Sequence, residues 1–138
     1  MKTPFIKLYR GIIHLNNQQD SGIRCYSKNA FSTPVDEIIE SIDLSNLAHL
    51  SLEYKVFIVA DDGFAFHGCV NILYDKQNDT AMVMISDVIE SDNNQNIGQY
   101  SFDFTASKNV GNNKLEVKLL NGNGYNYKYR IIRQILSL

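Results

Sequence analysis

The sequence has little cysteine, no long apolar run and no excess of basic charge. Its 138 residues contain only two cysteines, Cys25 and Cys69, which are too few for a disulfide framework. No apolar stretch approaches the roughly 18–20 residues that a membrane-spanning helix needs. The net formal charge is −2, whereas a general nucleic-acid binder normally carries a clear basic excess. We therefore expect neither a membrane partner nor a nucleic-acid partner.

The composition is typical of a globular protein. Apolar residues make up 44% of the chain and charged residues 20%, and the length suits a single domain over residues 1–138. Residues 1–10 lack the apolar stretch and small-residue cleavage pattern of a secretory signal. We therefore expect a cytoplasmic protein whose two thiols are free.

Motifs for catalysis or cofactor binding are also missing. His14, His49 and His67 are far apart and form neither HxH nor HExxH. There is no GxSxG or Walker sequence, and the GxG of Gly122 and Gly124 lies between two predicted strands without a third glycine. The sequence accordingly predicts no catalytic residue, no metal ligand and no cofactor, and enzymatic activity is the less favoured class.

One segment carries the signals of a helix. Thr33 is a suitable N-cap, Pro34 suits the first helical position, and acidic residues follow in the first turn. The apolar residues that recur at helical spacing are Val35, Ile38, Ile39 and Ile42. These signals predict a helix that begins at Thr33-Pro34 and fades near Asp43.

The rest of the chain has the pattern of strands separated by turn residues. Strands are predicted over residues 4–15, 23–28, 54–60, 64–74, 81–89, 100–106, about 115–119 and 125–132. Short turns favour sequential antiparallel pairing, because parallel neighbours need long crossovers. We therefore predict an α+β fold that is mainly β. It is an antiparallel meander of about 6–8 strands, as a curved sheet or partly closed barrel, with one helix packed on one face.

Charge is distributed unevenly along the chain. Residues 1–35 carry a net +4, residues 36–107 carry −11, and residues 108–138 carry +5. In one interpretation the basic ends pair with these acids on a solvated surface, where each pair contributes about 0–1 kcal/mol. In the other, carboxylates gather on one side and steer a cationic partner. The second interpretation predicts an acidic patch made of Asp61, Asp62, Asp87, Glu90 and Asp92.

This acidic patch suggests a non-catalytic binding protein. We expect a small cytoplasmic inhibitor, of the general character of bacterial immunity proteins, that neutralises a basic partner such as a nuclease toxin domain. Two alternatives stay open. One is a ligand-binding or enzymatic β-barrel with a pocket lined by aromatic side chains such as Phe64, Phe66, Phe102 and Phe104. The other is a phage or secretion assembly subunit that joins copies through its sheet edges.

Three local patterns are weaker. His67 and Cys69 share a face of a predicted strand, but no third orienting group can be named. The loops from Asp75 to Asp79 and at Asp92-Asn93-Asn94 offer oxygen ligands for Ca²⁺ without the spacing of an EF-hand. In the segment 125–130, tyrosines alternate with polar and basic residues, so a strand would point the rings and the cations to opposite faces. A platform for single-stranded nucleic acid needs both on one side.

Overall fold

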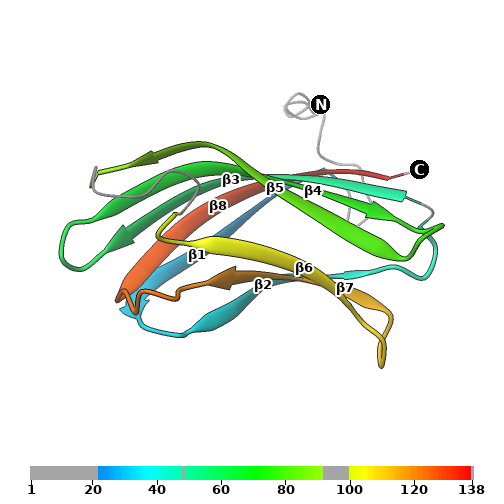
Figure 1. The fold of residues 1–138 in the computed structure, drawn as a ribbon, viewed down its shortest axis with the longest axis horizontal. Coiled ribbons are helices and arrows are strands. Elements are labelled where there is room, and N and C mark those ends of the chain that lie inside the picture. The colour runs from blue at the N-terminus through cyan, green and yellow to red at the C-terminus, as the bar shows by residue number, and fades with distance from the viewer. Residues whose placement is uncertain (1–21, 48, 92–99, 138) are drawn as a thin grey trace, which may run out of the picture.

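Two antiparallel sheets packed face to face make up the described part of the chain (Figure 1). The computed structural model describes residues 22–47, 49–91 and 100–137. The strands are β1 (Gly22–Ser32), β2 (Asp36–Asp43), β3 (His49–Ala60), β4 (Ala65–Asp75), β5 (Thr80–Glu90), β6 (Asp103–Asn109), β7 (Lys114–Leu120) and β8 (Tyr127–Ser137). The five-stranded sheet has the order β1-β8-β3-β4-β5, and the three-stranded sheet has the order β2-β7-β6.

The strand order departs from a simple meander. The strands β3, β4 and β5 are sequential neighbours, as are β6 and β7, which confirms antiparallel pairing through short turns. The last strand, β8, instead lies between β1 and β3, and β2 joins the other sheet beside β7. The predicted curved sheet or partly closed barrel is therefore wrong, and the architecture is a sandwich of two sheets.

The predicted helix is also wrong. Residues Asp36–Asp43 form β2, which pairs with β7, and the described residues contain no helix. A bulge between Ile38 and Glu40 places two consecutive residues, Ile39 and Glu40, on the buried side. Of the four apolar residues at helical spacing, the strand buries Ile39 and Ile42, while Val35 and Ile38 stay 76% and 50% exposed. Pairing with β7 overrides the helix-start signals, and the β-branched isoleucines suit a strand.

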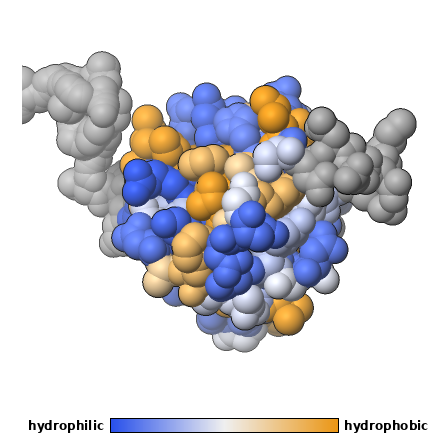
Figure 2. Space-filling view, turned by 90° about the vertical axis from the view of Figure 1, so that its left-hand side faces the viewer, coloured by the Kyte–Doolittle hydropathy of each residue, from blue (hydrophilic) through white to orange (hydrophobic). Residues whose placement is uncertain are grey.

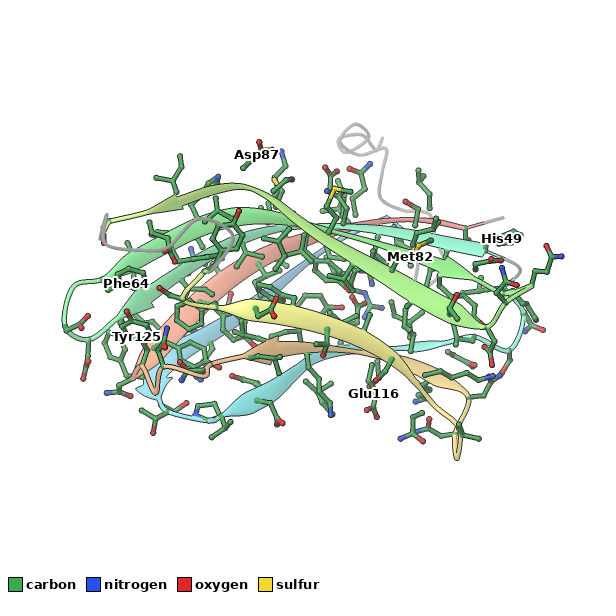
Figure 3. The ribbon with its side chains drawn as sticks, viewed as in Figure 1. His49, Phe64, Met82, Asp87, Glu116 and Tyr125 are labelled. Carbon is green, nitrogen blue, oxygen red and sulfur yellow. The ribbon has the colours of Figure 1, made fainter. Side chains whose placement is uncertain are left out.

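Side chains from the inner faces of both sheets form one core. In β3 and β4 buried and exposed residues alternate along almost the whole strand, as expected when one sheet face is covered. At one end the core consists of aromatic rings. Phe64 stacks on Tyr125 with centroids 4.8 Å apart, and Phe102 lies 5.6 Å from Phe66 in an edge-on arrangement. Figure 3 shows Phe64 and Tyr125 at this end of the molecule.

The two sheets leave four strands at sheet edges. These are β1 and β5 in the five-stranded sheet and β2 and β6 in the three-stranded sheet. The outer face of the five-stranded sheet carries most of the exposed large hydrophobic side chains of the described residues. They are Ile23, Phe57, Leu73, Met82, Met84, Ile89, Ile132 and Leu136. Within the described ranges, no helix is long and apolar enough to cross a membrane.

Candidate functional site

Two members of the predicted acidic patch lie together at the turn between β3 and β4. The backbone N–H of Asp61 donates to the carbonyl of Asn126 at 2.9 Å, and the Asn126 amide donates to the Asp61 carboxylate at 2.7 Å. The Asp62 carboxylate accepts the backbone N–H of Phe64 at 2.9 Å. Both side chains are exposed, and both also shape the turn. Figure 2 shows this end of the molecule as a mosaic of hydrophilic and hydrophobic residues.

The other members of the acidic patch lie elsewhere. Asp87 is exposed at a bulge in β5, and Figure 3 places it on the outer side of the five-stranded sheet. Glu90 is buried and accepts the backbone N–H of Ser101 at 2.9 Å. Asp92 lies outside the described residues. The structure thus brings Asp61 and Asp62 together, but it does not place Glu90 on the same surface.

Several acids of residues 36–107 pair with bases from the two ends of the chain. Lys28 contacts Glu37 at 3.0 Å, and Lys108 contacts Asp79 at 3.0 Å. The third such pair, Arg133 with Glu40, is almost fully buried. At these three positions the charges of the chain ends compensate acids of the middle, but the pair of Arg133 and Glu40 is buried and not on a solvated surface as the first interpretation expects.

The buried pair of Glu40 and Arg133 links the two sheets. The Arg133 guanidinium donates from Nε to both Glu40 carboxylate oxygens at 3.1 Å and from its terminal nitrogens to Glu40 and to the Gly22 carbonyl. Two phenols complete the site, because Tyr26 and Tyr54 donate to Glu40 at 2.6 and 2.8 Å. Burial and the adjacent Glu40 raise the pKa of both phenols, so each remains a hydrogen-bond donor at neutral pH.

A second polar cluster lies beside the first. Glu37 of β2 accepts from Tyr127 at 2.7 Å and from Lys28 at 3.0 Å, and the Lys28 ammonium also lies 3.8 Å from the centre of the Tyr127 ring. Burial and the adjacent Glu37 raise the pKa of Tyr129 to about 12. These contacts hold the inner sides of β1 and β8 against β2. The outer sides of the same two strands are therefore well positioned to form a rigid surface.

That outer surface contains a groove of about 360 Å³. It lies where β1 departs from regular pairing with β8. Between two register pairs β1 advances four residues, from Lys28 to Ser32, while β8 advances only two, from Tyr129 to Tyr127. The two extra residues form a bulge, a feature common beside functional sites. We call this hollow the cationic groove; its lining residues are Lys28, Asn29, Phe57, Val59, Lys128, Tyr129 and Arg130.

Positive charge dominates the cationic groove. Arg130 and Lys128 point to the outer face of β8, and neither forms an ion pair with any described residue. The Lys128 ammonium lies 4.7 Å from the centre of the Phe31 ring, a cation–π distance. The Lys28 ammonium is engaged by Glu37, and none of the lining residues is acidic. An anion is therefore the complementary ligand for this groove.

The segment 125–130 has the orientation that its sequence predicts. Tyr127 is buried and Tyr129 faces Glu37, whereas Lys128 and Arg130 face outward. Sequence reasoning missed the exposed aromatic side chain that lies beside these cations. Phe57 on β3 is the register partner of Arg130, and this residue is 51% exposed. The only sequence signal was an aromatic residue on the outward side of β3. That Arg130 lies next to it could not be predicted, because β3 and β8 are far apart in the sequence.

The remaining candidate residues do not assemble into a reactive site. His67 and Cys69 share the outer face of β4 as expected, and their register partners across β3 are Phe57 and Lys55. Among the described residues, no group of three or more His, Cys, Asp or Glu side chains is arranged to hold a metal ion. The sequence matches no protein-family model and no curated protein.

Proposed function

We propose that this protein is a non-catalytic binding domain that holds an anionic ligand in the cationic groove. The observation that carries this proposal is the pair Lys128 and Arg130, two outward cations without ion pairs among the described residues, beside the exposed ring of Phe57. The volume of about 360 Å³ falls within the range of small-molecule sites. A ligand of this size with a charged group and an apolar part suits both components of the lining.

The chemistry of the two cations supports a phosphate or carboxylate group. The guanidinium of Arg130 presents a planar set of donors that matches two oxygens of such an anion. Lys128 lies two residues before Arg130 on the same face of β8 and adds a flexible point charge. The neighbouring strands β1 and β3 hold β8 on both sides, so the two cations project from a central strand.

A titration with phenyl phosphate, an aromatic ring that carries a phosphate group, tests the proposal. We expect shifts in the NMR signals of the cationic groove and an affinity that falls as ionic strength rises. Arg130→Gln and Lys128→Gln should each weaken binding about tenfold, because each removes a charged hydrogen bond. Lys114→Gln is the matched control, since Lys114 is exposed on the three-stranded sheet. If the control weakens binding as much as the other two variants, the cationic groove is not the site.

Inhibition of a basic partner remains a second proposal. It is favoured by the adjacent exposed carboxylates of Asp61 and Asp62, which belong to no ion pair among the described residues. With a candidate nuclease toxin domain, the association rate should fall as salt is added, and the double variant Asp61→Asn/Asp62→Asn should reduce that dependence. A rate that is independent of salt would remove this second proposal.

A further inference from the structure

The cationic groove combines charge with an exposed aromatic surface, and exposed aromatic side chains are few in the described part of the chain. The described residues contain three exposed aromatic side chains, Phe31, Phe57 and Tyr100. Phe57 lines the groove, and Phe31 lies beside it against the Lys128 ammonium. The cations and the rings share one face because they come from different strands. Along β8, successive side chains point to opposite faces, so its tyrosines and its cations lie on different faces. Phe31 and Phe57 come from the neighbouring strands β1 and β3, so they can share the outer face with the cations.

We propose that the anion in the cationic groove is a nucleotide, whose base stacks on Phe57 while Arg130 and Lys128 hold its phosphate. This inference rests on the proposed function and specifies its ligand. Stacking on an aromatic ring next to basic side chains is the general way in which proteins bind unpaired nucleotides. Arg130 and Phe57 are register partners, so the charged part and the aromatic part of the site lie on adjacent strands.

The floor of the groove favours side-chain recognition over backbone recognition. Peptides commonly bind to sheets by adding a strand to a free edge, where backbone groups lack partners. The strands β8 and β3 are central, and each is paired on both sides. Over β8 and β3 a ligand therefore meets side chains, and only the β1 bulge, at the rim, leaves backbone groups outside the regular pairing. This arrangement suits a flat base better than an extended acidic peptide.

One further residue can read the edge of a base. Asn29 belongs to the β1 bulge and lines the groove. Its amide offers both donors and an acceptor, as the polar edge of a base does. The volume of about 360 Å³ lies near the lower end of the range for small-molecule sites, and the chain has a net charge of −2. Both facts favour one nucleotide over a long nucleic-acid tract.

Calorimetric titration with three related probes tests the inference. The probes are adenosine 5′-monophosphate, ribose 5-phosphate, which lacks the base, and adenosine, which lacks the phosphate. We expect the complete nucleotide to bind at least tenfold more tightly than either fragment, because stacking and the phosphate contacts act together. Phe57→Leu should weaken nucleotide binding roughly fivefold to hundredfold, whereas Phe57→Tyr keeps an aromatic ring and should stay within about threefold of wild type.

The outcomes separate this inference from the proposed function. If the nucleotide binds no more tightly than ribose 5-phosphate, or if Phe57→Leu has no effect, the nucleotide assignment is overturned while the anion site stands. If no phosphate-bearing probe binds, phenyl phosphate included, the proposed function itself fails. Titration with a short single-stranded oligonucleotide shows whether the ligand is a free nucleotide or part of a nucleic-acid chain. Tighter binding of the oligonucleotide than of the monophosphate indicates a nucleotide within a chain, and equal binding indicates a free nucleotide.

Discussion

Removing one partner of the buried ion pair should destabilise the protein severely. Arg133 is 0% exposed, and its guanidinium reaches both oxygens of Glu40. Arg133→Met keeps much of the side-chain volume but leaves the Glu40 carboxylate with only the phenols of Tyr26 and Tyr54 as donors. A buried charge without a counter-charge is unfavourable, because water no longer solvates it.

The expected loss is about 3–5 kcal/mol of the free energy of unfolding, the usual result of breaking a buried pair on one side. For a chain of this length, each kcal/mol lowers the melting temperature by about 3–4 °C, so the predicted decrease is about 9–20 °C. The exposed pair gives the matched comparison. Lys108→Met breaks the contact with Asp79, where water screens both charges, and should change stability by about 1 kcal/mol or less.

Urea unfolding followed by circular dichroism measures these losses, and a double-mutant cycle isolates the pair. Glu40→Gln alone should also be severe, because it leaves the charge of Arg133 buried. Glu40→Gln with Arg133→Met removes both charges, so its loss should be at least 2 kcal/mol smaller than the sum of the single losses. Two results would refute the reasoning: an Arg133→Met loss no larger than that of Lys108→Met, or single losses that simply add in the double variant.

Two further predictions concern alkaline pH and a turn. Burial and nearby carboxylates raise the pKa of Tyr26, Tyr54 and Tyr127, and they raise the pKa of Tyr129 to about 12. The contribution of these phenols to stability is therefore complete below pH 10, the pKa of tyrosine in the unfolded chain. It is lost as the pH rises through the pKa values of the folded state. Urea midpoints should therefore fall above about pH 10, with phenolate absorbance appearing together with unfolding; a midpoint constant to pH 12 would contradict this. Gly63 has φ +94, so Gly63→Ala should destabilise the protein by about 1 kcal/mol in thermal melts. Gly122 is a turn glycine without positive φ, so the control Gly122→Ala should be near neutral. Equal losses in the two variants would argue against backbone strain as the cause.

Local patterns predicted much of the five-stranded sheet. In β3 and β4 the alternation of apolar and polar residues matches the alternation of buried and exposed side chains at most positions, with Phe57 and Leu73 as apolar exceptions that are exposed. The turn signal of Asp61, Asp62 and Gly63 marks the observed hairpin, although the sheet that contains it also includes β8 and β1. Such hairpins depend on residues close together in the chain, so a reading of the sequence can recover them.

The segment after Thr33 shows where local patterns fail. Its start signals and its isoleucine spacing fit a helix, but β7 lies alongside it and pairs with it as a strand. The partner residues come from 114–120, more than seventy positions later, and no local pattern contains that information. A bulge then places Ile39 on the buried face with Ile42, while Val35 and Ile38 stay exposed.

Composition, periodicity and turn residues determined that this chain is rich in antiparallel strands, and in β3 and β4 they determined the alternation that most of the buried side chains follow. These properties follow from neighbours a few residues apart. Tertiary structure alone decided which charges meet. It buried Arg133 against Glu40, and it placed Phe57 beside Arg130. The reason is physical: contacts across strands and between sheets join residues that are dozens of positions apart, so their energies depend on the register of the whole fold.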